Sequence, residues 1–158
     1  MATNFNQNNW AHQHDKDWVT DLFLMHKKYG FHEWMQEKVA AGEWETLKEY
    51  LRFRVNFLEE ELNEIKAAIE NNDAEEVVDG LIDLAVVDIG TLDVFGIDSR
   101  TAWDRVNNAN MAKERGMKET RKNDYGAPDL VKPSGWVAPN HEGLHGIIGE
   151  IFANVKGS

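Results

Sequence analysis

The sequence lacks cysteine, so the chain forms no disulfide bond and has no thiol chemistry. It also lacks any apolar run approaching the ~20 residues of a membrane-spanning helix. Basic residues are scarce, with 17 against 28 acidic ones and a formal net charge of −11. Nucleic-acid polymers and anionic membranes bind basic surfaces, so neither is expected as a partner. The absence of cysteine suits a protein of the reducing cytoplasm.

The first residues, 1–14, are polar and rich in Asn and Gln, unlike a signal peptide. We therefore expect a flexible segment over 1–14 and a single domain over 15–158, which is long enough for one hydrophobic core. All three prolines fall within 123–139, which predicts a loop. The tail, 140–158, contains a short helical pattern that three regularly spaced glycines weaken.

Apolar residues at helical spacing predict an all-α fold, an antiparallel bundle of about four main helices. The expected helices cover 18–29, 43–69, 77–95 and 98–115, with Asp15 or Asp17 capping the first and Asp98 or Ser99 capping the last. Residues Asn71-Asn72-Asp73 break the helical pattern, so the two helices that flank them should lie antiparallel. The helix over 77–95 is apolar nearly all round, which is typical of a buried helix.

Two acidic pairs at helical spacing flank this break, Glu61 with Glu64 and Glu76 with Asp79. Residues three apart share a helix face, so each pair can direct two carboxylates toward one point. Asp83 follows one turn later on the apolar helix. Carboxylates on a buried helix are costly unless they pair, become protonated or bind a metal. Their hard oxygen atoms suit Mg²⁺ or Mn²⁺.

Each acidic group also has an ordinary structural interpretation. Runs such as Glu59-Glu60-Glu61 are common on solvated helix faces, and Asp73 followed by Glu76 is typical of a helix N-cap. Both pairs together, on adjacent helices, favour a metal site. A carboxylate-bridged di-iron bundle would need Glu-x-x-His on two helices. The chain offers only Glu142 with His145, in its glycine-spaced tail.

Three polar residues recur at three-residue steps on the helix predicted over 98–115: Asn107, Asn110 and Lys113. Their face is either an ordinary solvated surface or one that binds a triphosphate. Basic residues then cluster within ten positions, which favours an anion-facing loop: Lys113, Arg115, Lys118, Arg121 and Lys122. The apolar residues of the same helix should pack inward: Trp103, Val106 and Met111.

The acidic motif Glu60-Glu61-x-x-Glu64 followed by Glu76-x-x-Asp79 resembles that of the MazG-like nucleotide pyrophosphohydrolases, of the all-α NTP pyrophosphatase superfamily. The later segments Asn110-Met111-Ala112-Lys113 and Lys132-Pro133-x-Gly135-Trp136 are similar to those of the phosphoribosyl-ATP pyrophosphohydrolase-like branch. The resemblance spans roughly residues 23–139, with the motifs in the expected order.

This resemblance implies Mg²⁺-dependent hydrolysis of nucleoside or deoxynucleoside triphosphates to a monophosphate and pyrophosphate, with Mn²⁺ as a substitute metal. Water would attack the α-phosphorus. The resemblance also implies a homodimer or homotetramer. Two alternatives stay open: hydrolysis of phosphoribosyl-ATP on the same fold, and a non-enzymatic helical module that binds partners through an acidic surface.

The same resemblance assigns roles to individual residues. The metal ligands would be Glu61, Glu64, Glu76 and Asp79, with Asp83 as an extra ligand or directly behind the ligands. Glu60 would polarise the attacking water, and Lys113 would neutralise charge on the leaving pyrophosphate. The remaining candidates would bind substrate, through its phosphates or its base: Asn107, Asn110, Arg115, Trp34 and His32.

Overall fold

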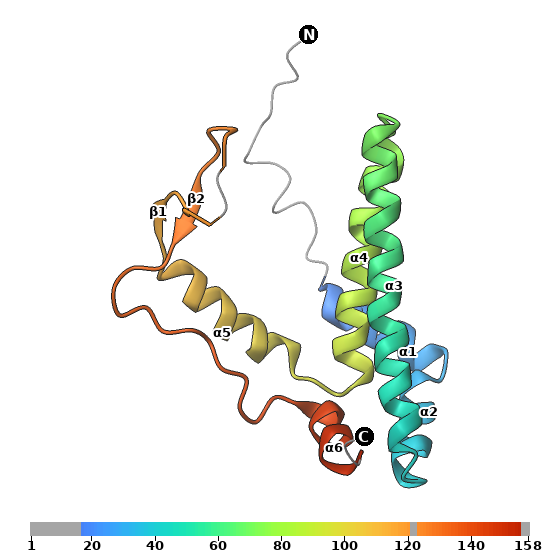
Figure 1. Cartoon of the computed structure of the whole chain (residues 1–158). Coiled ribbons are helices and arrows are strands. Elements are labelled where there is room, and N and C mark those ends of the chain that lie inside the picture. Colours follow the sequence, from blue (N-terminus) through green and yellow to red (C-terminus); the bar gives the residue numbers. More distant parts are fainter. Residues whose placement is uncertain (1–16, 121–122, 156–158) are drawn as a thin grey trace. The chain divides into compact units, whose positions relative to one another are not determined.

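The computed structural model describes residues 17–120 and 123–155. Within them lie the helices α1 (Trp18–Lys28), α2 (Phe31–Ala40), α3 (Trp44–Glu70), α4 (Ala74–Val94), α5 (Ser99–Met111) and α6 (Gly146–Asn154). The short strands β1 (Glu114–Gly116) and β2 (Asp129–Val131) pair antiparallel, with Arg115 opposite Leu130. Figure 1 shows how strongly helix predominates. The predicted all-α class is confirmed.

The chain divides into two compact units between Val94 and Phe95. The first unit contains α1 to α4, and the second contains α5, α6 and the two strands. None of the helices in the described ranges is long and apolar enough to cross a membrane.

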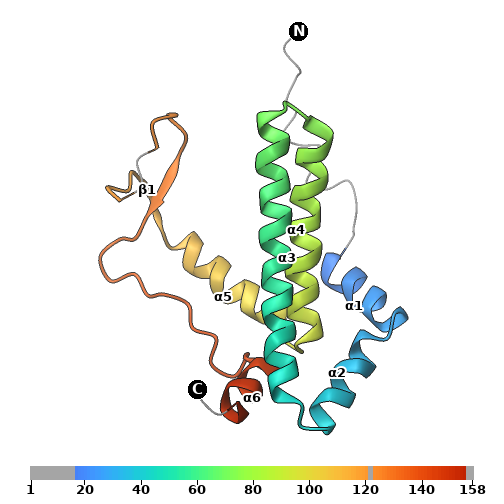
Figure 2. The same cartoon turned by 45° about the vertical axis from the view of Figure 1, so that its right-hand side comes forward.

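Helices α3 and α4 form a long antiparallel hairpin, as predicted from the break at residues 71–73 (Figures 1 and 2). Asn72 adopts a positive φ of 55°, which Asn tolerates better than most residues. The Oδ1 atom of Asp73 accepts a hydrogen bond from the Glu76 backbone N–H at 3.2 Å. This contact satisfies one of the free amides at the start of α4.

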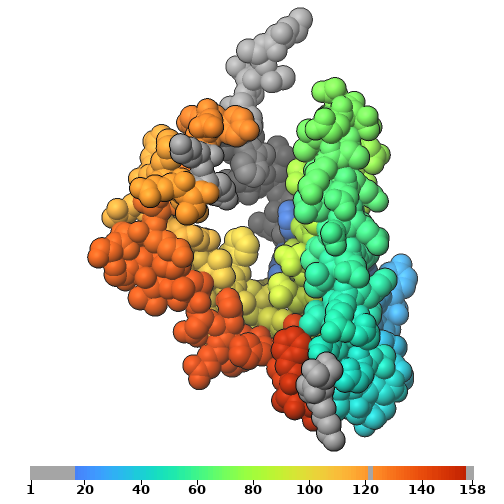
Figure 3. Space-filling model, in the orientation of Figure 1, coloured from blue at the N-terminus to red at the C-terminus, as the bar shows by residue number. Residues whose placement is uncertain are grey.

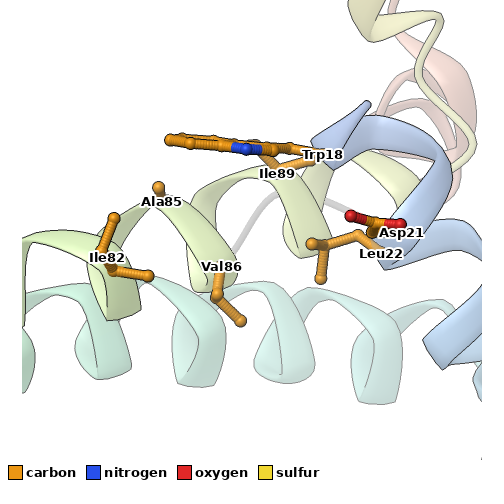
Figure 4. A pocket seen from close by; sticks show the side chains of 7 residues that line it. All are labelled: Trp18, Asp21, Leu22, Ile82, Ala85, Val86 and Ile89. Carbon is orange, nitrogen blue, oxygen red and sulfur yellow. The ribbon is translucent and has the colours of Figure 1, made fainter. Parts of the chain in front are cut away.

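Helices α1 and α2 pack against the end of the hairpin that is remote from the turn (Figure 2). Asp17 caps α1 by accepting the Val19 amide hydrogen at 3.2 Å, which confirms one of the two predicted caps. A hollow of about 190 Å³ remains between α1 and α4, with the Trp18 ring extended over Ala85 (Figure 4). The buried apolar residues of this unit are Leu22, Met35, Leu47, Ile65, Ala68, Val87 and Val94.

The prediction that α4 is a buried helix is wrong for the single chain. Val78, Leu81 and Ile82 are 61%, 54% and 47% exposed. The turn end of the hairpin stands clear of α1 and α2 in Figure 3, and α3 is the main helix of the described ranges that packs on α4. Apolar composition shows how much surface a helix could bury, whereas burial depends on how many elements pack against it.

In the second unit, Asp98 caps α5, as predicted. Its carboxylate accepts from the Thr101 amide at 3.1 Å and from the Thr101 hydroxyl at 2.7 Å, and these bonds lower the pKa of Asp98. The inward packing predicted for α5 is wrong. Its apolar residues Trp103, Val106 and Met111 are exposed, because the described part of this unit places no helix against that face.

Helix α5 ends at Met111 rather than near residue 115, because the chain enters β1 at Glu114. Sequence periodicity did not predict this two-stranded ladder, since three-residue strands are too short to show alternation. Gly116 allows the strands to approach, because a Cβ there would lie 2.7 Å from Val131 Cγ2. Helix α6 lies within the predicted tail helix, and the Ile147 amide donates to the Phe95 carbonyl at 2.9 Å.

Candidate active site

Acidic side chains from α3 and α4 converge on Glu61, part-way along the hairpin. The Glu61 side chain is only 9% exposed. Burial raises the pKa of its carboxyl group, and repulsion from neighbouring carboxylates raises it further: Asp83, Glu64, Asp79 and Glu60. Within the described ranges, no lysine or arginine forms an ion pair with Glu61. The hairpin therefore concentrates negative charge that a bound cation would stabilise.

The other predicted acidic residues lie around this centre. Glu60, Glu64 and Asp79 are exposed, and Asp83 is half-buried. Glu76 is exposed in the first turn of α4, one turn from Asp79 toward the Asp73 cap. The structure thus brings Glu61, Glu64, Asp79 and Asp83 together and places Glu76 at the margin of the cluster.

A cavity of about 230 Å³ adjoins the acidic cluster, with Glu61 and Asp83 in its wall. Most of the remaining wall is apolar, and it comes from all four helices of the first unit: Met25, Phe31, Phe57, Val86 and Val87. Two nitrogen-bearing side chains complete the lining, His26 and Arg54. The site therefore joins an apolar compartment to a cluster of oxygen ligands.

Arg54 is a buried cation in this wall, 7% exposed. Its Nη2 atom donates to the Val87 carbonyl at 3.0 Å, and its Nε atom donates to Thr91 Oγ1 at 3.0 Å. Gly90 makes room for it, since a Cβ there would lie 3.0 Å from Arg54 Nη2. Sequence reasoning assigned no site role to Arg54. The available signal was a basic residue within the apolar stripe of α3.

The two residues predicted to contact the base lie outside this cavity lining. His32 Nε2 is 2.7 Å from Asp93 Oδ2, and His26 Nδ1 is 2.7 Å from the same oxygen. The Trp34 ring packs edge-on against Tyr50, with centroids 4.6 Å apart. Sequence reasoning missed His26 and Asp93 as candidate site residues.

In the second unit, two lysines gather on one indole ring. Lys113 Nζ lies 5.4 Å from the centre of the Trp136 ring, and Lys132 Nζ lies 4.6 Å from it. Lys113 also donates to Asn110 Oδ1 at 2.8 Å, and Trp136 Nε1 donates to the Ala109 carbonyl at 2.7 Å. Sequence reasoning assigned no role to Lys132, although its Lys-Pro-x-Gly-Trp segment was a signal.

The other predicted substrate contacts of this unit are solvent-exposed. Asn107 lies on α5, and Arg115 lies on β1 opposite Leu130. Exposure leaves both side chains accessible to an anionic ligand, and their roles stay predictions.

Residues 29–110, just over half of the 158, match the family model described as phosphoribosyl-ATP pyrophosphohydrolase. The matched stretch contains α3, α4 and both acidic pairs. Comparison with curated proteins yields no match. The chain belongs to the phosphoribosyl-ATP pyrophosphohydrolase family, within the all-α NTP pyrophosphatase superfamily, and is therefore a pyrophosphohydrolase that acts on nucleotides.

Proposed function

We propose that the protein hydrolyses nucleoside or deoxynucleoside triphosphates to the monophosphate and pyrophosphate. The observation that supports this most is the position of Glu61, a nearly buried carboxylate surrounded by other carboxylates at the edge of an apolar cavity. Such a site can hold a metal ion at the phosphates and a base in the cavity.

The acidic residues fit Mg²⁺, because they present hard oxygen atoms in excess of any neighbouring positive charge. Glu61, Glu64 and Asp79 would hold the ion with Glu76, and Asp83 would be an extra ligand or lie directly behind them. Bound Mg²⁺, or Mn²⁺ in its place, would offset the negative charge of the phosphates.

Glu60 would act on the attacking water. It neighbours Glu61 on α3, and adjacent side chains diverge by about 100° around a helix, so the two residues cannot have the same role. The Glu60 carboxylate would accept a proton as the water oxygen bonds to the α-phosphorus. The bond from the α-phosphorus to the bridging oxygen would break, and pyrophosphate would leave.

The cavity beside Glu61 would receive the nucleoside. Phe31 and Phe57 offer apolar walls to a flat base, and the Arg54 guanidinium offers a charge for a polar edge or a phosphate. Base contacts by Trp34 and His32 stay predictions, as do the phosphate contacts assigned to Asn107, Asn110, Lys113 and Arg115.

The outer surface of the hairpin supports self-association as a homodimer or homotetramer. Exposed apolar side chains gather there on α4, including Val78, Leu81 and Ile82. A second hollow, about 620 Å³ and largely apolar, lies between Leu58 and Leu62 of α3 and Leu84 of α4. Contiguous apolar surface of this kind marks interaction sites. Analytical ultracentrifugation would show a monomer if this proposal is wrong.

The family match itself favours a second candidate substrate, phosphoribosyl-ATP. Its hydrolysis cleaves the same kind of bond. A panel of the eight standard ribo- and deoxyribonucleoside triphosphates beside phosphoribosyl-ATP, assayed for pyrophosphate with Mg²⁺, separates the two. We expect the highest kcat/KM with one of the eight standard nucleoside triphosphates. A clear preference for phosphoribosyl-ATP would replace the proposal.

Hydrolysis in ¹⁸O-labelled water tests the position of attack. We expect the label in the monophosphate alone, with no nucleoside diphosphate at early times. Label in the pyrophosphate would place the attack at the β-phosphorus and refute the mechanism.

A further inference from the structure

Three side chains that commonly bind metals meet at the end of the hairpin remote from its turn. His26 comes from α1, His32 from α2 and Asp93 from α4. One ligand atom from each lies within 4.8 Å of the other two. Both imidazole rings approach the same carboxylate oxygen, at 2.7 Å each. The three residues thus form one compact set of nitrogen and oxygen ligands.

The backbone around this set favours a positive charge. Asp93 lies in the last turn of α4, and His26 lies in the last turn of α1. Carbonyl groups at a helix C-terminus carry partial negative charge, which disfavours a carboxylate and attracts a cation. The Asp93 side chain is only 12% exposed, so solvent compensates its charge weakly. A bound cation would offset the negative charge of both helix ends and of the carboxylate, beyond the two hydrogen bonds that the imidazoles already make with it.

Aromatic side chains pack against both imidazole rings. His26 is 2% exposed and stacks on Phe31, with ring centroids 4.5 Å apart. His32 packs on Phe23 at 4.8 Å. Gly90 admits the His26 ring, because a Cβ there would lie 3.0 Å from His26 Cε1. Packing that fixes each ring before binding reduces the entropy lost when an ion binds.

We propose that His26, His32 and Asp93 bind a divalent transition-metal ion of the Zn²⁺ class. Two imidazoles with one carboxylate form a ligand set typical of Zn²⁺, whereas Mg²⁺ prefers oxygen ligands alone. Ligand atoms around tetrahedral Zn²⁺ stand roughly 3.3 Å apart, as bonds of about 2.0–2.1 Å require. Each nitrogen–oxygen pair would open from 2.7 Å to that spacing, and the fourth position would be left to water.

This site is separate from the carboxylate cluster, although His26 also lines the cavity next to Glu61. The ion would cross-link α1, α2 and α4 directly behind the cavity wall. The proposal does not depend on which nucleotide is hydrolysed, because binding is measured without substrate.

Calorimetric titration with Zn²⁺ tests the site in the full-length, metal-stripped chain, with excess Mg²⁺ present throughout. His12 and His14, outside the described residues, are replaced by Asn in every sample, so that they cannot compete. We expect one Zn²⁺ per chain. His32→Asn and Asp93→Asn should each weaken binding at least about 100-fold, more than the loss of a supporting contact would.

Two control variants test where on the chain Zn²⁺ binds. Glu61→Gln should bind Zn²⁺ as the parent does, which separates this site from the carboxylate cluster even if hydrolysis is lost. His145→Asn in the second unit should also bind normally. Circular dichroism checks each fold, and the visible bands of Co²⁺ report the ligands independently. Absence of Zn²⁺ binding in the parent, or unchanged binding in folded His32→Asn, would overturn the proposal.

Discussion

Two groups of side chains at the α3–α4 hairpin place a carboxylate in opposite surroundings. One is the acidic cluster around Glu61, and the other is the set of His26, His32 and Asp93. At Glu61, four neighbouring carboxylates repel the charge, and burial raises the pKa of the group. At Asp93, two imidazole nitrogens meet a single oxygen at 2.7 Å. The first arrangement would be stabilised by protonation or by a bound cation, whereas the second already has hydrogen-bond partners. The comparison shows that position on a helix alone does not determine the chemistry of an acidic residue, because the neighbouring side chains, including those from other helices, also act on it.

The largest effect should follow from removal of ligands at the first cluster. We expect Glu61→Ala and Asp79→Ala each to abolish Mg²⁺-dependent hydrolysis while circular dichroism shows the helices retained. The control is Glu70→Ala, an exposed glutamate at the end of α3 that is not among the predicted ligands. Near-parental turnover in both ligand variants would remove the metal assignment.

A smaller and more selective effect should separate Glu60 from Glu61. Glu60→Gln keeps the shape of the side chain and loses its basicity. We expect kcat to fall by about 10²–10⁴-fold, as is typical for loss of a general base, with little change in Mg²⁺ affinity. Glu61→Gln should instead weaken both Mg²⁺ and nucleotide binding. Calorimetry beside steady-state kinetics measures both, and equal loss of metal affinity would make Glu60 another ligand.

The packing behind both clusters meets at Gly90. A methyl group there would stand 3.0 Å from Arg54 Nη2 and from His26 Cε1, both well buried. We expect Gly90→Ala to lower the free energy of unfolding by about 1–3 kcal/mol, the usual cost of overpacking. Urea denaturation measures it. Lys66→Ala, at an exposed position of α3, should change it by less than about 0.5 kcal/mol. Equal effects would show that the site behind Gly90 is loosely packed.

The smallest effect concerns pH. The folded chain holds the Glu61 proton more tightly than the unfolded chain, so this group favours folding below its ordinary pKa of 4.5. The benefit is lost as the pH rises through the raised pKa. Without metal at pH 7, Glu61→Gln should therefore raise Tm by a small amount. The gain should disappear below pH 4.5. A lower Tm at pH 7 would mean that the charge is compensated.

Local patterns in the sequence correctly predicted the main hairpin. These patterns are the apolar spacing, the break at residues 71–73 and the caps at Asp17 and Asp98. Each depends only on residues close together in the sequence, so it can be recognised without knowing which helices pack together. The acidic motif also identified the superfamily, which the family match confirms. Its assignment as a metal site stays a prediction.

Features that depend on packing could not be predicted in this way. His26 and Asp93 are 67 positions apart, and His32 and Asp93 are 61 apart. Periodicity gives the face of a residue on its own helix, but not the helix that meets that face.

The sequence by itself determined the helical class, the family and the order of the acidic pairs, because these are encoded in short-range spacing and residue type. Only the tertiary structure decided how much of α4 is covered, which side chains wall the cavity beside Glu61, and that two histidines share the Asp93 carboxylate. These outcomes depend on which helices approach one another, and that depends on the packing of the whole unit.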